Sequence, residues 1–522
     1  MPKVTSLSLF QLIHAMTKAE KRHFKLYAHY HSSSNHKMNY VHLFDSIEKQ
    51  KIYDEEKIKQ SGIVKREYLP MLKNYLHNLI LESMRVLESK GNDIDTRLSN
   101  MLHHARIMRR KGLTEEEFKF LTKVKKLALK HERWITALEA LMSIRKVMTR
   151  KEEKNTEQVD EEIRGTFMKL SNLHDYLKIH SRVDHSLKKS EVQRGHASEA
   201  VKQLMKHPLL GNEAKGLSAE AKRLYYSSRS QYYYFTGDYR RFYKLFIKNV
   251  RFVENNLSTL EFPELAYSSA LNNLTIAQCM LKKHKDALIT IAKHRSVIKK
   301  DETAMMHAFM YSNINETNYY LATGNFEKGK HTVEKIEKEI ARLASAPYTQ
   351  QVSLVFNMAY IYFGSGNFHK SLECINKIIN QTASGLREDI QVWSHILRIL
   401  IHYELNTKEI IPHLLITSYR FLLKREQLHK VEENILIFIQ RLIKTDTRPI
   451  SKTALKPSKK ALLIECRRFH HELLLIIRNP EEKKALHYFD LISWLESKME
   501  NRSFSNIVRE KSLSGNTLQI VP

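Results

Sequence analysis

The chain has 522 residues, of which 86 are Lys or Arg and 57 are Asp or Glu, so its formal net charge is +29. This length is well above that of one ordinary domain and leaves ample material for an extended core. Only 14 Gly and 10 Pro occur, too few for the many turns of a strand-rich fold. Because straight-chain helix formers abound, the composition predicts an all-α protein.

The sequence disfavours several classes of protein, namely disulfide-rich, zinc-binding, secreted and membrane-spanning ones. The three cysteines, Cys279, Cys374 and Cys466, lie far apart, which disfavours a disulfide framework or a zinc site. Residues 1–10 lack the pattern of a signal peptide, and no run approaches the roughly 20 apolar residues that span a bilayer. We therefore expect a cytoplasmic protein without a membrane span, metal or other cofactor. The basic excess favours nucleic acid, acidic protein or anionic surfaces as partners, although it is spread along the whole chain.

Residues 1–92 are predicted to form an N-terminal helical module. Thr17 and Glu20 have the spacing of a capping box, which predicts the start of a helix there. A short helix is expected to begin at Asp54, and Gly62 is expected to turn the chain into a long helix. The module is interpreted as a cap for the helices that follow.

The same outline of short helix, turn and long helix is that of a helix-turn-helix. It would place Lys65, Arg66 and Lys73 against DNA. The cap is the preferred interpretation, because such outlines are frequent in all-α proteins and acidic residues cluster at 54–56.

Residues 93–215 are predicted to form irregular helical hairpins. His174, His180 and His185 lack the spacing of metal ligands, so no metal site is predicted. The basic residues near the first turn are Arg106, Arg109, Arg110, Lys111, Lys123, Lys125 and Lys126. We interpret them as a solvated face rather than a nucleic-acid site, and few aromatic residues are interleaved for stacking on single strands.

Residues 216–447 repeat a pattern of helix, turn and helix. The turns begin at Gly237, Lys282, Gly324 and Gly366, at intervals of 45, 42 and 42 residues. A small residue follows five positions later in three of these four turns, at Ala287, Gly329 and Ser371. Periods of this size predict an α-solenoid of stacked antiparallel helical hairpins.

This segment resembles the tetratricopeptide repeat, whose signature is a Gly-Asp/Asn-Tyr/Phe turn flanked by small residues and a Tyr. The matching residues are Thr317, Tyr320, Gly324, Phe326 and Gly329 in one copy, and Ala359, Tyr362, Gly366, Phe368 and Ser371 in the next. The 42-residue period exceeds the family's 34 and the closing proline is lacking, so each helix should be about one turn longer. The chain is also similar to uncharacterised bacterial proteins of this layout, which implies no function.

The repeat brings three asparagines, Asn273, Asn315 and Asn357, into the same phase of successive first helices. In the family that it resembles, this phase faces a concave groove, as does that of Asn318. Asparagine offers one acceptor and two donors, so a row of them predicts binding of an extended peptide by its backbone. The tyrosines that would supply side-chain pockets are Tyr234, Tyr311 and Tyr360. The alternative is that these asparagines bond neighbouring helices or water, or recur through repeat ancestry alone.

The remainder of the chain is less regular. Residues 448–460 are predicted to form a basic linker with two prolines, and residues 461–500 to form two helices that cap the stack. Residues 501–522 are weakly periodic and are predicted to be a disordered tail.

The sequence contains no motif that predicts catalysis. A phosphate-binding Gly-rich loop, a nucleophile elbow and a His-Glu-x-x-His motif are all lacking. The favoured hypothesis is a non-enzymatic scaffold that binds a partner protein or extended peptide in the groove of the solenoid. The second hypothesis is a DNA-binding regulator that uses the N-terminal module, with the solenoid as a sensor or an oligomerisation arm.

Overall fold

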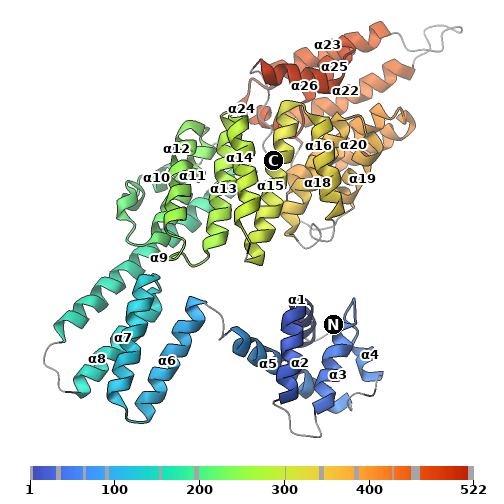
Figure 1. Ribbon diagram of the computed structural model, residues 1–522. Coiled ribbons are helices and arrows are strands. Elements are labelled where there is room, and N and C mark those ends of the chain that lie inside the picture. Colours follow the sequence, from blue (N-terminus) through green and yellow to red (C-terminus); the bar gives the residue numbers. More distant parts are fainter. Residues whose placement is uncertain are drawn as a thin grey trace. The chain divides into compact units, whose positions relative to one another are not determined.

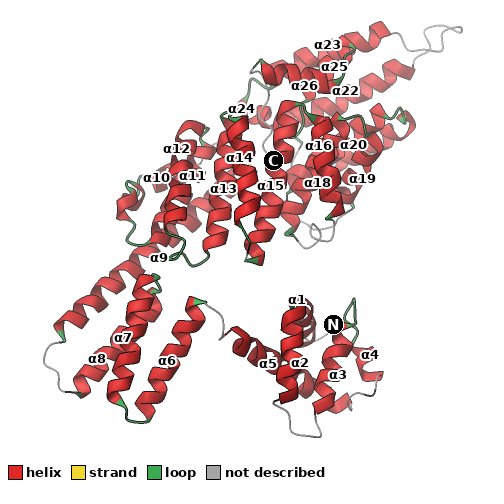
Figure 2. Cartoon of the chain, viewed as in Figure 1, coloured by secondary structure: helices red, strands yellow, loops and turns green. Residues whose placement is uncertain are grey.

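The computed structural model describes residues 4–30, 37–60, 62, 66–88, 93–151, 156–192, 199–299, 301–339, 346–380, 387–425, 428–447 and 459–514. Within these ranges all regular structure is helical, as Figure 2 shows, so the all-α prediction is confirmed. Helices pack chiefly against their neighbours in the chain. None of the helices in this part of the chain has the length and apolar character needed to cross a membrane.

The chain divides into two compact units, Met1–Leu170 and Ser171–Pro522, which are described separately (Figure 1). The N-terminal helices of the first unit are α1 (Val4–Ala15), α2 (Lys18–Tyr30), α3 (Lys37–Glu48), α4 (Glu55–Gln60), a short 3-10 helix (Arg66–Tyr68) and α5 (Leu69–Glu88). The predicted capping box is present at the start of α2. There the backbone N–H of Thr17 donates to Glu20 Oε2 at 2.7 Å, and the backbone N–H of Glu20 donates to Thr17 Oγ1 at 3.3 Å.

The first unit continues with α6 (Ile94–Arg110), α7 (Thr114–Lys130), α8 (Trp134–Arg150) and the start of α9 (Glu157–Val192). Tight turns join α6 to α7 and α7 to α8, and each of these pairs packs closely, so α6 and α8 run in the same direction on either side of α7. Leu121, Val124 and Leu141 are fully buried among these helices. The division between the units falls inside α9, whereas the sequence predicted one segment over residues 93–215.

The second unit contains an array of helical hairpins. Its helices are α10 (Glu199–Met205), α11 (Ala219–Phe235), α12 (Tyr239–Asn255), α13 (Pro263–Met280), α14 (His284–Val297), α15 (Glu302–Thr323), α16 (Phe326–Lys338), α18 (Tyr348–Gly364), α19 (Phe368–Ile379), α20 (Glu388–Glu404) and α21 (Ile411–Lys424). We call α11, α13, α15, α18 and α20 the first helices of their hairpins. Adjacent first helices pack together, α13 against α15 and α15 against α18. This arrangement is consistent with a helical repeat array.

The four predicted turns share one backbone conformation. Gly237, Gly324 and Gly366 have φ angles of +74°, +67° and +75°. These left-handed values suit glycine, which has no Cβ to clash with the backbone. Lys282 adopts the same region with φ of 57°. The repeat in the sequence therefore corresponds to a recurring helix end.

Small residues allow the helices of a hairpin to approach closely. A Cβ on Gly329 would lie 3.0 Å from Tyr320 Cβ, and Ser371 Oγ donates to the carbonyl of Ala359 at 2.7 Å. Phe326 is fully buried, and a methyl group on Gly364 would overlap its ring. The aromatic residue of this turn thus packs against the next hairpin.

The C-terminal helices are α22 (Lys430–Thr447), α23 (Lys459–Ile476), α24 (Pro480–Lys483), α25 (Leu491–Glu500) and α26 (Phe504–Leu513). Helix α26 lies within the stretch that was predicted to be a disordered tail. It forms because Ile507 and Val508 are buried and Phe504 stacks on Phe326, with ring centroids 5.6 Å apart. The predicted linker lies largely outside the described residues, as do residues 515–522.

Candidate functional site

The repeated asparagines are engaged with one another across neighbouring first helices. Asn315 Nδ2 donates to Asn272 Oδ1 at 2.8 Å, which joins α15 to α13. Asn357 Nδ2 donates to Asn318 Oδ1 at 2.7 Å and to Thr317 Oγ1 at 3.1 Å, which joins α18 to α15. These hydrogen bonds fit the alternative interpretation of the sequence, in which the asparagines bond neighbouring helices rather than a peptide.

The row of amides differs by one residue from the predicted row. Asn315, Asn318 and Asn357 are buried, and the α13 residue that pairs with them is Asn272 rather than Asn273. Asn273 is half-buried at the next position of the helix. Because consecutive helical residues point about 100° apart, a shift of one position moves the amide to a different face. The sequence shows both asparagines but does not show which one faces α15.

The three predicted tyrosines lie in different surroundings. Tyr360 is fully buried, and its hydroxyl accepts a hydrogen bond from the backbone N–H of Asp490 at 2.9 Å. Burial raises its pKa well above the ordinary value of a tyrosine. Tyr311 and Tyr234 are half-buried: Tyr311 lies against His307 at 4.3 Å, and Tyr234 packs against Phe242 at 5.6 Å, both measured between ring centroids.

Tyr360 is buried because the C-terminal helices cover part of the predicted groove wall. Phe489, between α24 and α25, packs on Tyr360 with ring centroids 4.9 Å apart. Trp494 Nε1 donates to Glu404 Oε1 at 2.7 Å, and the Tyr488 ring stacks on Trp393 at 5.7 Å. The chain's own C-terminal segment therefore covers Tyr360 of α18, where a side-chain pocket for a peptide was predicted, and it also packs against α20.

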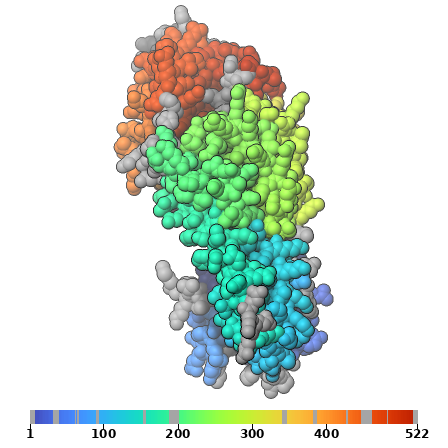
Figure 3. All heavy atoms as spheres, turned by 90° about the vertical axis from the view of Figure 1, so that its left-hand side faces the viewer, coloured from blue at the N-terminus to red at the C-terminus, as the bar shows by residue number. Residues whose placement is uncertain are grey.

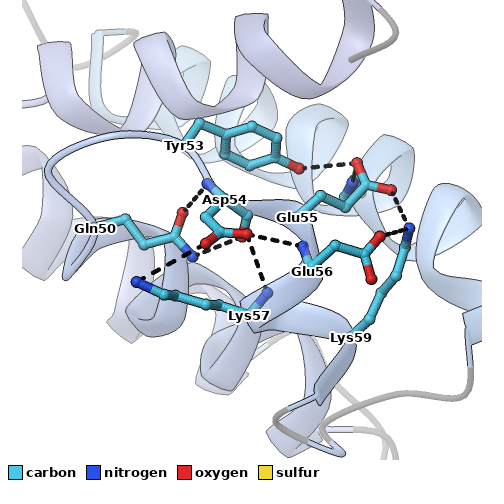
Figure 4. A network of polar contacts seen from close by, with 8 residues as sticks. Gln50, Tyr53, Asp54, Glu55, Glu56, Lys57 and Lys59 are labelled. Atoms are coloured by element: carbon cyan, nitrogen blue, oxygen red, sulfur yellow. Dashed lines mark hydrogen bonds and ion pairs between the residues drawn. The ribbon is translucent and has the colours of Figure 1, made fainter. Parts of the chain in front are cut away.

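The N-terminal module places the predicted DNA-contacting residues apart. Arg66 is exposed in the 3-10 helix, Lys65 lies outside the described residues, and Lys73 is only 6% exposed. The Lys73 ammonium lies 2.6 Å from Glu55 Oε2. Figure 4 shows the polar network around Glu55, in which the Tyr53 hydroxyl donates to the same carboxylate oxygen at 3.3 Å.

This environment constrains Lys73. A DNA phosphate could reach its ammonium only if the lysine left a nearly buried ion pair, and separation of such a pair leaves a buried charge uncompensated. The sequence placed an acidic cluster near the helix but did not show that Glu55 faces Lys73, because 18 residues separate them. The geometry of Lys73 thus fits a structural role.

A buried serine and two histidines form a polar cluster that the sequence analysis missed. Ser268 Oγ lies 2.6 Å from His294 Nε2 and 2.7 Å from His307 Nδ1, and it links α13, α14 and α15. Burial lowers the pKa of His294 and of His307 to about 4, so both imidazoles are neutral at neutral pH. Ser268 and His294 are shielded from solvent. His307 is half-buried, and the cluster holds three helices together.

A cavity of about 420 Å³ lies between α14, α15 and α16. The Arg295 guanidinium lies 2.6 Å from Glu316 Oε2 and donates to Asn313 Oδ1 at 2.7 Å. The Tyr320 hydroxyl donates to the other oxygen of Glu316 at 3.1 Å. Arg295 and Glu316 are thus paired with each other, while Lys335 and Glu339 also line the cavity.

An open groove of about 500 Å³ lies in the first unit along α6, α7 and α8. Its apolar lining includes Leu102 of α6, Leu121 of α7 and Ile135, Leu138 and Met142 of α8. Ile135 is 72% exposed and Met142 is 53% exposed. Large apolar side chains that gather in an exposed groove mark an interaction site, because their burial by a partner is favourable.

Some charged residues of this groove form ion pairs, and others have no carboxylate within ion-pair distance in the part of the chain that the structure describes. Arg106 donates to Glu139 at 2.6 Å, and Glu117 accepts from Arg150 at 2.7 Å. Arg109 and Lys146 also line the groove. Across the described ranges no carboxylate lies within ion-pair distance of the side chain of Arg109 or Lys146. The groove therefore combines an apolar strip with two available cations.

No group of three or more His, Cys, Asp or Glu side chains that could hold a metal ion occurs within the described ranges. No protein-family model matches the chain, and comparison with curated proteins and with solved structures finds no significant similarity.

Proposed function

We propose that the protein is a non-enzymatic scaffold that binds a partner protein through a groove in its stacked helices. The observation that carries this proposal is the groove of α6, α7 and α8, along which Ile135 and Met142 are exposed and Leu138 is half-buried. Burial of such side chains contributes about 25 cal/mol for each Å² removed from water. A groove of this kind suits one helix or extended segment of a partner.

The partner segment is expected to carry both apolar and acidic side chains. The apolar ones would cover Ile135 and Met142, and carboxylates would pair with Arg109 and Lys146 at the C-terminal ends of α6 and α8. This chemistry agrees with the basic character of the whole chain, whose formal charge of +29 favours acidic partners.

A tetratricopeptide-like architecture supports the same proposal. The left-handed turns at Gly237, Gly324 and Gly366 and the close helix contact at Gly329 are features that such repeats use to stack hairpins. Stacked hairpins commonly present extended binding surfaces. The predicted peptide groove at Asn273, Asn315, Asn318 and Asn357 is a weaker candidate, because three of these residues are buried and their amides form hydrogen bonds between helices.

The test is partner capture with variants of the exposed groove residues. The double variant Ile135→Ser, Met142→Ser should retain its fold, because both side chains are largely exposed, and should lose the proteins that the wild-type chain retains from a lysate of the native host. The matched control is Ile416→Ser, Leu423→Ser, whose side chains are 53% and 56% exposed in the second unit. Equal recovery of every partner by both variants would refute the groove as the binding surface.

DNA binding through the N-terminal module has less support, because Lys73 is nearly buried and paired with Glu55. A mobility-shift experiment with the full chain and duplex DNA tests it. If Lys73→Met and wild type bind duplex DNA equally, Lys73 makes no DNA contact. Loss of duplex binding in an Arg66→Ser variant would revive the hypothesis.

A further inference from the structure

Basic and tyrosine side chains gather where the first two turns of the array lie. This group, which we call the turn-edge patch, comes from the end of α11, from α12 and from the turn before α14. Its members are Arg229, Tyr233, Arg240, Arg241, Tyr243, Lys244, Lys248 and Lys283. Arg240, Arg241, Lys244, Lys248 and Lys283 are exposed. The green surface that includes α11 and α12 is open to solvent in Figure 3.

Acidic residues neutralise only part of the patch. Asp238 lies 3.4 Å from Arg241, and Asp286 lies 3.9 Å from Lys283. Among the residues that the structure describes, no carboxylate is within ion-pair distance of Arg240, Lys244 or Lys248. The patch therefore presents a net positive charge that does not depend on the protonation of any histidine.

The cations without an acidic partner form one row. Arg240, Lys244 and Lys248 occupy successive positions four residues apart on α12, so their side chains lie on one face of the helix. Each step along this row is about 6 Å. A flexible chain of phosphate groups can follow such a row, whereas a single small anion would use only one of its members.

Tyrosine rings lie beside the other three cations of the patch, Arg229, Arg241 and Lys283. The Arg229 guanidinium lies 5.2 Å from the Tyr233 ring centroid, and Arg241 lies 5.9 Å from it. Lys283 Nζ lies 5.1 Å from the Tyr243 ring centroid. Both tyrosines are half-buried, so their rings are held in place while part of each remains accessible. Cations beside fixed aromatic rings are the combination with which proteins bind single-stranded nucleic acid.

The basic cluster on α6 and α7 differs from the patch in that two of its cations are paired with carboxylates and its ring contact is to a phenylalanine. On α6 and α7, Arg106 is paired with Glu139 and Lys125 with Glu162. In this cluster Lys123 Nζ lies 5.8 Å from the centroid of the Phe120 ring. This cluster therefore provides a matched control surface of similar composition and different geometry.

We propose that the turn-edge patch binds single-stranded nucleic acid. Arg240, Lys244 and Lys248 contact successive phosphates, and Tyr233 and Tyr243 offer rings on which bases stack. Binding of this kind depends little on sequence, because every base has an aromatic face. The patch lies on other elements than the groove of α6, α7 and α8, so this activity is independent of the proposed scaffold function.

The experiment measures binding of the full chain to a fluorescent single-stranded oligonucleotide of about 20 thymidines, by anisotropy, between about 50 and 200 mM salt. The triple variant Arg240→Ser, Lys244→Ser, Lys248→Ser should reduce the slope of log affinity against log salt by about 2, since each phosphate contact on a single strand contributes about 0.7. The control Arg110→Ser, Lys111→Ser, Lys126→Ser removes the same charge from exposed positions of the other cluster. Equal losses in both variants, or no binding by wild type at low salt, would overturn the proposal.

The tyrosines provide a second measurement that charge alone would not change. Tyr243→Ala should weaken binding about five-fold or more, whereas Tyr243→Phe keeps the ring and should bind like wild type. Circular dichroism establishes that each variant is folded. Polyglutamate of matched charge should displace the oligonucleotide far less effectively than unlabelled oligothymidine does. Equal displacement by both polymers, or equal affinity of the Ala and Phe variants, would identify a general site for acidic chains and contradict the proposal.

Discussion

The two copies of the turn Gly-Asn-Phe are identical in sequence, yet we expect their phenylalanines to contribute different amounts to the free energy of unfolding. Phe326 is fully buried and stacks on Phe504 of α26, with ring centroids 5.6 Å apart. Phe368 is half-buried and meets Phe363 edge-on at 5.3 Å. The perturbation is Phe326→Ala, and Phe368→Ala is its matched control.

The magnitude follows from burial. Removal of a fully buried Phe side chain costs about 3–5 kcal/mol, because the lost transfer free energy adds to that of the cavity left behind. For the half-buried Phe368 the loss of apolar contact is smaller, and we expect about 1–2 kcal/mol. Phe326→Ala should also loosen α26, because Phe504 loses the ring on which it stacks.

The assay is urea unfolding of the full chain, followed by circular dichroism, with midpoints of wild type and the two variants compared at a shared m value. Both substitutions lie in the second unit, so they report on the same transition. Limited proteolysis near residue 503 should be faster in Phe326→Ala than in Phe368→Ala. Equal midpoints for the two variants, or a loss below about 1 kcal/mol for Phe326→Ala, would refute the packing argument.

Three further predictions concern the same unit. Gly324→Ala should destabilise this unit by more than about 2 kcal/mol, because a Cβ there would lie 2.6 Å from Arg509 N. Gly366→Ala should cost only about 1 kcal/mol of backbone strain, because no atom of the described residues lies within contact distance of a Cβ there. Thermal unfolding should show the lower melting temperature for Gly324→Ala. Lys282→Gly should raise stability by about 1 kcal/mol, because lysine there has φ of 57°, and an unchanged or lower melting temperature would contradict this. Burial lowers the pKa of His294 in the folded chain to about 4, below its ordinary 6.5. Its contribution to the free energy of unfolding is therefore complete above pH 6.5 and falls by up to about 3 kcal/mol as the pH drops toward 4. His294→Gln should flatten the pH dependence of the urea midpoint.

The helical class and the repeat were accessible from the sequence, because both depend on local preferences. Few glycines and prolines leave long helices uninterrupted. The left-handed turns at Gly324 and Gly366 and the capping box at Thr17 involve neighbouring residues, whose requirements a short stretch of sequence expresses. The small residue at Gly329 likewise follows from the close approach of two helices of one hairpin.

The candidate sites were less accessible, because they depend on the rotation of helices and on distant partners. Asn272 rather than Asn273 faces Asn315, a difference of one position that the period of 42 residues does not resolve. The turn-edge patch unites residues from Arg229 to Lys283, which only the stacking of α11, α12 and α14 brings near one another.

The end of the chain shows most clearly what local sequence determined and what the tertiary structure decided. Residues 504–513 contain too few apolar positions to predict a stable isolated helix, and short helices are marginal in water. Ile507 and Val508 nevertheless become buried against the stack, where Phe504 is half-buried. Ser505 Oγ donates to the carbonyl of Gly324 at 3.0 Å. The local sequence specifies the hairpins and their turns, because these arise from contacts within about 40 residues. Only the tertiary structure decides which surfaces stay open, because contacts across 90, 130 and 181 residues cover α20, α18 and the turn at Gly324, respectively.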